Sequence, residues 1–595
     1  MKRKLKLLVA LVMAMVMAVG CGSNTTPSNT SESQKETPVE QESKVEESKV
    51  EESKYPDYLN LESQRPIVKE GEEVTITMAI KRSGMAKTPI DEAWFVQFIE
   101  NELNINLEIE DIKSDALAER RSLMLSANDM PDMMLALGIT TQDIEKYGVE
   151  NGQFLAMSDY ASEELTPNLL ALWEKYEDYM PNYTASDGKI YGLPRIGVSG
   201  VIGEGDTLPV WRGVIDAKYL DAVGLKEVPT TLDGFMDMLR AFKALDPKEM
   251  GVDEIWPMLS NLSYDKFYMG AALGWILQTP DDLTGPAWDA ATGKTIIPCM
   301  DKEKFTEYVT LYNTMYNERL IHPDYFTLDQ TTVRALLATG SAGVMWDSSI
   351  LNYREGVDNW QEDIKSPLPL TSKWSKTAVT PMASIVNESQ VFISADTKYP
   401  EVCMRLIDYL CTPEGYVYAT NGCPAGKEEA FDTPNFTGYI LKDDGSGFTY
   451  QEVKDGIYAS DFEYYVNAVQ IVMGSQLCTI NDKRDQWDIA GVEYKEPVVD
   501  YTTPGDKTGY LMCEAVEGTL VQGLPFLRLS SDVYTEYSDL KTVLQTYVNA
   551  ETTKFIVGQR PLSELPKFFE EIKQMGGDRY EEILLDAYKN YTGTN

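Results

Sequence analysis

The segment "ALDPKEMGVDEIWP", residues 244–257, has the spacing of a calcium-binding loop without its full set of oxygen ligands. Asp246 and Gly251 stand where the 12-residue loop of an EF-hand has its first ligand and its glycine. The third and fifth positions supply oxygens in such loops, and here they hold Lys248 and Met250. An ammonium group and a thioether are poor ligands for Ca²⁺, which requires six to eight oxygens.

The later positions of this loop are also poor in oxygen. Glu254 occupies the ninth position, but Pro257 stands at the twelfth, where a bidentate acid is needed. The sequence therefore predicts a degenerate calcium loop that holds no metal. We expect the ammonium group of Lys248 to lie among the carboxylates of Asp246, Asp253 and Glu254 and to take over part of the charge of the ion.

The histidine and cysteine content restricts the chemistry further. A single histidine, His322, excludes His-rich zinc sites and paired-His metalloprotease motifs, and it argues against a Ser-His-Asp triad. No cofactor motif is visible, and none is expected. Six cysteines follow Cys21 without C-x-x-C spacing, so disulfides and buried free thiols remain alternatives for them. These six are Cys299, Cys403, Cys411, Cys423, Cys478 and Cys513.

The N-terminal residues indicate export and a lipid tether. Basic residues precede a 14-residue apolar run, Leu7 to Gly20, which is shorter than the roughly 20 residues of a membrane-spanning helix. We therefore predict a signal peptide at 1–20. Small residues before Cys21 resemble a bacterial lipobox, which implies diacylation of that thiol. Residues 21–60 are rich in Ser, Thr and Glu and repeat "KVEES", so they are expected to form a disordered, lipid-anchored linker.

Length and charge describe the remainder of the chain. The body from about Tyr55 onward is too long for one hydrophobic core and predicts two or more lobes. The chain has 94 acidic and 53 basic residues and a formal net charge of −41. Such a surface repels nucleic acid and anionic lipid, so neither is an expected partner. The only membrane contact expected is through the lipid anchor.

The first part of the body alternates between strand and helix patterns. Residues 72–80 alternate and are rich in β-branched side chains, and 106–112 do the same, so both are predicted strands. Apolar spacing predicts a helix over 90–105. Residues 116–137 predict a helix, a turn and a short apolar strand. This order is typical of an α/β lobe with a largely parallel sheet.

Several stretches together resemble one family. They include "RSLMLSANDMPDMM", "SDGKIYGLP", "KYLDAVGLKEVPTTLDGFMDMLRAFKALDP", "RLIHPDYF", "GSAGVMWDSS", "YPEVCMRLIDYLCTPEG" and the C-terminal "FIVGQRPLSELPKFFEEIKQMGGDRYEEILLDAYKNY". Their order and spacing are similar to those of extracellular solute-binding lipoproteins of carbohydrate ABC importers. The similar proteins are the large Gram-positive type within the maltodextrin-binding-protein-like superfamily. Between about 430 and 545 no stretch supports the resemblance.

The resemblance implies an α/β fold of the periplasmic-binding-protein type (type II). Two lobes joined by hinge strands would enclose one ligand in a cleft between them. We expect lobe 1 to comprise 70–195 plus about 385–430. Lobe 2 and the C-terminal helices would comprise 196–384 plus about 431–595.

The implied function is capture of an extracellular carbohydrate, expected to be an oligosaccharide, and its delivery to an ABC transporter permease. The chain would act as a monomer on the outer face of the cell membrane. One departure weakens the ligand assignment, because the family usually has Arg-Lys-Asp-Trp where residues 216–219 read Asp-Ala-Lys-Tyr. The alternatives are a binding protein for another solute, such as a peptide, and a ligand-presenting subunit of a sensor. A secreted glycoside hydrolase is disfavoured because no catalytic motif stands out.

Two candidate ligand contacts lie in "GVMWDSS". Trp346 is placed at the end of a predicted strand and resembles the tryptophan of a cleft loop in maltodextrin-type binding proteins, where an indole face covers the apolar face of a sugar. The alternative is a tryptophan of the core. Asp347 is a candidate acceptor for sugar hydroxyl groups, or else a cap of the next turn.

Four further candidates come from the first half of the body. Tyr191 and Arg195 flank the expected first crossing between the lobes, with hinge packing and a surface ion pair as their alternatives. Trp211 follows that crossing, where family members often have an aromatic residue. Asp132 is expected at a strand end that faces the cleft, with a turn aspartate as the alternative.

Overall fold

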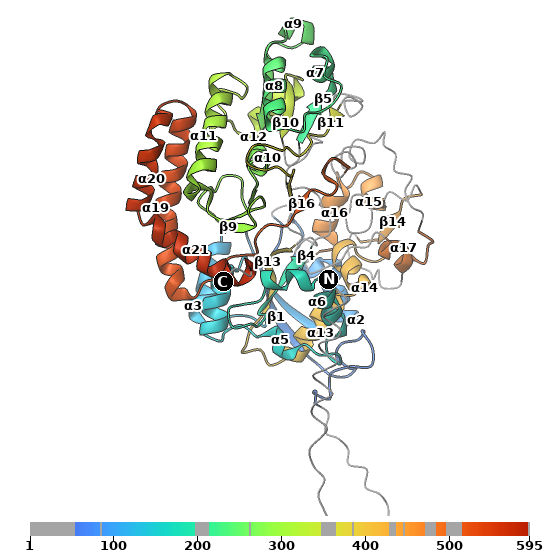
Figure 1. Ribbon diagram of the computed structural model, residues 1–595. Helices are drawn as coiled ribbons and strands as arrows, with labels where there is room; N and C mark the ends of the chain where they lie inside the picture. The colour runs from blue at the N-terminus through green and yellow to red at the C-terminus, as the bar shows by residue number, and fades with distance from the viewer. Residues whose placement is uncertain are drawn as a thin grey trace, which may run out of the picture. The chain divides into compact units, whose positions relative to one another are not determined.

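Two β-sheets, each with its own hydrophobic core, organise the chain in a computed structural model (Figure 1). The structure describes residues 54–83, 86–196, 213–260, 263–346, 364–382, 386–427, 436–443, 447–470, 484–494 and 514–592. We call the residues that pack around the first sheet lobe 1 and those that pack around the second sheet lobe 2.

The sheet of lobe 1 has the order β2-β1-β3-β13-β4. Its strands are β1 (Thr75–Lys81), β2 (Asn106–Ile112), β3 (Met133–Leu135), β4 (Gly192–Ile196) and β13 (Val386–Ile393). Strand β1 runs parallel to β2 and β3, whereas β13 runs antiparallel to β3 and β4. Helices α2 (Trp94–Glu102) and α3 (Leu117–Ala127) connect the parallel strands. The predicted alternation of strand and helix over the first part of the body is thereby confirmed.

The sheet of lobe 2 has the order β11-β5-β10-β6. Its strands are β5 (Gly213–Asp216), β6 (Trp256–Ser260), β10 (Ala342–Trp346) and β11 (Ile364–Lys365). Strands β6 and β10 are parallel, and β5 is antiparallel to β10. Helix α8 (Leu232–Lys243) packs on β6 and begins at Thr231, whose side chain accepts the amide of Gly234. This cap agrees with the helix start predicted at Thr230 or Thr231.

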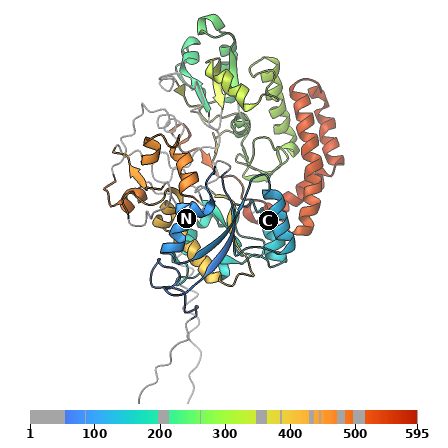
Figure 2. The same ribbon diagram turned by 180° about the vertical axis from the view of Figure 1, so that it is seen from behind.

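The C-terminal helices belong to the core of lobe 2. They are α19 (Ser531–Ile556), α20 (Leu565–Gln574) and α21 (Gly577–Thr592). Helix α19 packs against α11 (Lys302–Asn317), and Figure 2 shows the two side by side from behind. Apolar residues of all three C-terminal helices are buried in this core, among them Phe555, Phe568 and Leu584. Their burial explains the strong apolar spacing of the C-terminal sequence.

Two boundaries predicted from sequence require correction. Residues 436–470 were expected in lobe 2, but Tyr439, Tyr450 and Tyr464 are buried in the core of lobe 1. Their aromatic rings add to a core that α13 (Pro400–Leu410) and α14 (Pro413–Asn421) also form. The linker was expected to extend to residue 60, yet Tyr55 and Leu59 are already buried against the same core.

Candidate functional site

The carboxyl ends of parallel strands define one candidate edge in lobe 2. Strands β6 and β10 end side by side, with Ser260 opposite Trp346, and Gly213 at the start of β5 lies on the other side of Trp346. Ligands of open α/β sheets bind outside the carboxyl ends of strands. Trp211 and Asp347 adjoin this edge in the sequence but lie outside the described residues. Their roles stay predictions.

Trp346 is a core residue in this structure. Its side chain is 0% exposed, and the centroid of its ring lies 4.7 Å from that of Tyr268. A methyl group added at Gly213 would come within 2.5 Å of the indole, which explains why this position has no side chain. Of the two alternatives given for Trp346, a cleft residue or a core residue, the structure shows the indole in the core. Contact of the indole with ligand stays a prediction.

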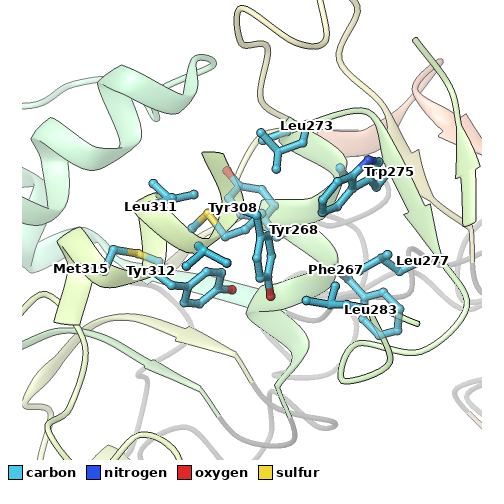
Figure 3. Packing of buried hydrophobic residues seen from close by; sticks show 14 of the residues in the cluster. Phe267, Tyr268, Leu273, Trp275, Leu277, Leu283, Tyr308, Leu311, Tyr312 and Met315 are labelled. Carbon is cyan, nitrogen blue, oxygen red and sulfur yellow. The ribbon is translucent and has the colours of Figure 1, made fainter. Parts of the chain in front are cut away.

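A buried carboxylate held by tyrosines lies next to this edge, and sequence reasoning missed it. Asp265 is at the start of α10 (Tyr264–Ala272) and is 0% exposed. Its oxygens accept hydrogen bonds from the hydroxyl groups of Tyr312, at 2.8 Å, and Tyr325, at 2.8 and 2.9 Å. Burial raises the pKa of both phenols, and the charge of Asp265 raises it further. Figure 3 shows Tyr312 in this core beside Tyr268 and Tyr308.

This cluster joins elements of lobe 2 next to the candidate edge. The phenols stay protonated and donate to Asp265, so they tie α11 and the segment after it to the helix that follows β6. No spacing in the sequence could reveal the cluster, because the two tyrosines are 47 and 60 residues away from the carboxylate.

Asp132 lies at the strand end that follows the turn. It precedes β3, and its neighbour in β1 is Thr77, close to the amino ends of both strands. One carboxylate oxygen accepts the Thr77 amide at 2.9 Å and its hydroxyl at 2.7 Å, and the other accepts the Thr397 hydroxyl at 2.6 Å. This carboxylate joins strands at the amino edge of the sheet, and its contact with ligand stays a prediction.

Tyr191 lies directly before β4 and Arg195 lies within that strand. Tyr191 is 6% exposed, packs in a core with Phe154 and Phe392, and donates its hydroxyl to Asp187 at 2.8 Å. Burial first, and the hydrogen bond to Asp187 second, raise the pKa of Tyr191. Arg195 belongs to β4, the last described strand before residue 197. Ligand contact by either residue stays a prediction.

A segment at 520–531 contacts both lobes and was not anticipated. Its strand β16 (Leu520–Val521) pairs with β12 (Thr380–Pro381), and Gln278 of lobe 2 donates to the Leu524 carbonyl at 3.1 Å. On the other side, Arg528 donates to the carbonyl of Asn182 in lobe 1 at 2.5 Å. Within the described residues, 520–531 is therefore a hydrogen-bonded connection between the two lobes.

Lobe 1 also caps the first helix of the C-terminal group. The amide of Ser531, the first residue of α19, donates to the carboxylate of Glu150 at 3.0 Å. The side chain of Gln142 donates to the Ser531 hydroxyl at 3.4 Å. A negative charge at the N-terminus of a long helix is favourable, because it meets the positive end of the helix dipole. The contact strengthens the connection made by 520–531.

Helix α16 (Asp461–Ala468) lies at the carboxyl end of β1. Arg82, the residue after β1, donates to the carbonyl of Val466 at 3.4 Å, and the Lys87 amide donates to the Asn467 side chain at 2.7 Å. No role was predicted for α16 from the sequence. The helix lies at the carboxyl end of β1, and ligands of α/β sheets bind at the carboxyl ends of strands. The sequence carried no signal for this, since the contacts join segments that are about 380 residues apart.

The loop with calcium-like spacing adopts helical structure. Asp246 caps the short helix α9 (Pro247–Met250) by accepting the Lys248 amide at 2.8 Å, and Gly251 ends it with φ +71°. Contrary to our expectation, the exposed side chain of Lys248 forms no ion pair with Asp246, Asp253 or Glu254. In the part of the chain that the structure describes, no group of three or more His, Cys, Asp or Glu side chains could hold a metal ion.

His322 is predicted to make stability depend on pH. Its Nδ1 accepts the Asp324 amide at 3.0 Å, which requires the neutral imidazole, and its ring lies 4.3 Å from that of Trp256. Burial is the largest influence and lowers the pKa of His322. The charges of Asp324 and Glu254 raise this pKa, whereas the charge of Arg319 lowers it. The folded state thus binds the proton less readily than the unfolded state, whose pKa is about 6.5.

The direction in which stability changes with pH follows from proton linkage. Stability from this neutral histidine is fully present above about pH 6.5 and is lost as pH falls through the lower, folded pKa. We expect urea unfolding between pH 7 and 5 to show a smaller pH dependence for His322→Gln than for the unchanged protein. Equal slopes would show that His322 does not contribute.

Comparison with known proteins agrees with an arrangement of two α/β lobes. Residues 86–417 match the family described as bacterial extracellular solute-binding protein. This match covers more than half of the chain, so the chain belongs to that family. Among the described residues, no helix is long and apolar enough to cross a membrane.

Two curated relatives are similar over long stretches. Lipoprotein LipO of Bacillus subtilis is 21% identical over 532 residues, which cover 85% of this chain and 90% of LipO. The fructooligosaccharide ABC transporter substrate-binding protein FusA of Streptococcus pneumoniae is 24% identical over 348 residues, which cover 53% of this chain and 63% of FusA.

Solved structures have the same fold. A solute-binding protein from Bifidobacterium longum infantis, titled as binding HMO, superposes with a TM-score of 0.67 at 16% identity and covers 87% of this chain and 99% of its own. FusA in complex with kestose superposes with a TM-score of 0.61 at 18% identity, covering 88% of this chain and 100% of its own. Another structure of FusA is titled as an EF-hand mutant. The fold is thus the two-lobe type II fold of solute-binding proteins.

Proposed function

We propose that this protein captures an extracellular oligosaccharide between its two lobes and delivers it to the permease subunits of an ABC importer. Its chemistry is binding and release, with no covalent bond made or broken. Ligand contacts on both lobes would stabilise a closed form, and a permease would select that form. The protein would act as a monomer.

The observation that carries this proposal is the extent of the family match, which begins after β1 and covers the other strands of both sheets up to the middle of α14. The names of the relatives support the ligand class. FusA is named for fructooligosaccharide and is titled in complex with kestose, and the Bifidobacterium longum protein is titled as binding HMO. The names of both proteins point to oligosaccharides rather than peptides.

The proposed location follows from the N-terminal residues. Cleavage before Cys21 and diacylation of its thiol would anchor the chain on the outer face of the membrane, as the lipobox resemblance implies. The name of LipO as a lipoprotein supports this. Residues 22–53 would then serve as the tether, because their composition cannot bury a core.

Isothermal titration calorimetry tests the ligand class. We would titrate the protein with fructooligosaccharides, milk-type oligosaccharides, N-glycan fragments and short peptides, and examine each bound sugar afterwards for cleavage. The expected result is saturable heat from at least one oligosaccharide, which is recovered intact. Saturable binding of peptides alone, or release of shortened sugars, would overturn the proposal.

The predicted contacts can be tested in the same assay. Arg195→Ala should weaken affinity for the bound oligosaccharide roughly 10- to 150-fold, because one charged hydrogen-bonding group contributes roughly 1.5–3 kcal/mol. The matched control is Arg240→Ala. Arg240 lies on helix α8, which precedes the amino end of β6, and its guanidinium is paired with the carboxylate of Glu318 at 2.6 Å. Equal affinities for the two variants would remove Arg195 from the site.

A further inference from the structure

Two lysine side chains reach backbone carbonyls of the loop that has calcium-like spacing. Lys218, in helix α7 (Ala217–Ala222), donates from Nζ to the carbonyl of Met250. Lys243, the last residue of α8, donates from Nζ to the carbonyl of Ile255 at 3.5 Å, and its ammonium lies 5.5 Å from the ring centroid of Trp256. Positive charge is thus present at two points along residues 246–257.

The loop's own residues do not fit a divalent cation. The Oδ1 atom of Asp246 is engaged in capping α9, and the position of the third ligand holds an ammonium side chain, Lys248. The position of the fifth ligand holds Met250, whose side chain is 4% exposed and packs in the core of lobe 2. An EF-hand draws its ligands inward around one ion, whereas this loop turns Met250 into the core and winds into a helix. Any similarity to the EF-hand named for FusA is therefore one of spacing.

An ammonium group can do part of what a calcium ion does in such a loop. Both draw carbonyl oxygens toward a positive centre, and a charge-assisted hydrogen bond is about twice as strong as a neutral one. The ammonium carries a single charge and three donors, so it needs no cage of carboxylates. Its covalent stem also fixes which elements it joins: Lys218 ties α7 to the end of α9, and Lys243 ties α8 to the residue before β6.

We propose that the ammonium groups of Lys218 and Lys243 take the structural place of a divalent cation in the 246–257 loop. Lobe 2 then holds α7, α8 and β6 together without metal, through cations that belong to the chain itself. Lys248, which the sequence singled out for this role, does not take part. The proposal concerns the folded lobe alone, and its test needs no sugar ligand.

Thermal unfolding in chelator and in calcium tests the proposal. The proteins compared are the unchanged chain, Lys218→Met, which keeps an apolar stem and removes the charge, and the control Lys248→Met. Lys248 is a suitable control because it lies in the same loop with an exposed side chain. Differential scanning calorimetry would follow the melting temperature in EDTA and in about 10 mM calcium chloride, roughly 100-fold above a Kd of about 0.1 mM.

We expect the melting temperature of the unchanged protein to be the same in both solutions. Lys218→Met should lower it by about 1–3 °C, and Lys248→Met should leave it unchanged. Limited proteolysis within 246–257 should be faster for Lys218→Met than for the control. The proposal is overturned if calcium raises the melting temperature and Asp246→Ala abolishes that rise, or if the two lysine variants behave alike.

Discussion

Replacing Trp346 with alanine is expected to lower the free energy of unfolding by about 3–5 kcal/mol, the usual cost of removing a buried aromatic side chain. The indole is 0% exposed and packs on Tyr268 with ring centroids 4.7 Å apart. It also fills the space above Gly213, where any side chain would collide with it. Truncation would leave a cavity between β10, β5 and α10 that the surrounding strands cannot close. Urea unfolding followed by circular dichroism measures the loss.

A second variant separates packing from ligand contact. Trp346→Phe keeps an aromatic ring in the core, and it removes an indole N–H that has no hydrogen-bond partner within the described residues. We expect Trp346→Phe to retain most of the stability and the affinity for oligosaccharide. If this variant is as stable as the unchanged protein but binds sugar much more weakly, the indole contacts ligand and the core interpretation fails.

Gly213→Ala offers an independent check of the same packing. A Cβ at this position would lie 2.5 to 3.0 Å from three ring atoms of Trp346, so either the ring or the start of β5 must shift. The variant should therefore be less stable than the unchanged protein, and tryptophan fluorescence should change with it.

Local patterns predicted much of the fold because they act within one element. The alternation at the start of β2 places Leu107 and Ile109 on one face of an edge strand, and the structure shows 106–112 as a strand. The Thr-Leu-Asp sequence at the start of α8 combines a cap at Thr231 with the acidic Asp233 in the first turn, and the helix begins there. Such signals need no knowledge of distant segments.

The assignment of segments to lobes depended on contacts that the sequence does not display. Residues 436–470 follow lobe 1 helices in the chain, yet no motif connects them with either lobe. Their tyrosines Tyr439, Tyr450 and Tyr464 are buried in the same core as Trp94, on which Phe436 stacks. Asn467 accepts a hydrogen bond from the Lys87 amide in the segment after β1. Only the folded chain shows that these residues complete the core of lobe 1 and cover one end of its sheet.

At the candidate site, the sequence likewise could not show in which direction a side chain points. A tryptophan at the end of a strand can point toward ligand or into the core, and the choice at Trp346 depends on Tyr268 and Gly213. Asp132 lies at the strand end after the turn, directly before β3, where its carboxylate is bonded to neighbouring chain segments and its contact with ligand stays a prediction. Spacing identified both residues as special without fixing the direction of their side chains.

Asp408→Ala is expected to cost about 3–5 kcal/mol of stability, because it breaks a buried ion pair and uncaps a helix at once. Asp408 is 0% exposed, and one of its oxygens accepts the amides of Asn168 and Leu169, at 2.8 and 2.9 Å, at the start of α6 (Pro167–Lys175). The other oxygen accepts the Asn168 side chain at 2.8 Å and Arg405 at 3.3 Å. The alanine variant leaves the guanidinium of Arg405, which is 2% exposed, buried without its counter-charge.

A double-mutant cycle measured by urea unfolding distinguishes the ion pair from the cap. Arg405→Met should cost less than Asp408→Ala, because the carboxylate would keep three hydrogen bonds from Asn168 and Leu169. In the double variant Arg405→Met with Asp408→Ala, part of the loss should be recovered, since no buried charge then lacks a partner. Strict additivity of the two single losses would mean that the charges do not interact. A loss below about 1 kcal/mol for Asp408→Ala would mean that the contact between α13 and α6 contributes little to lobe 1.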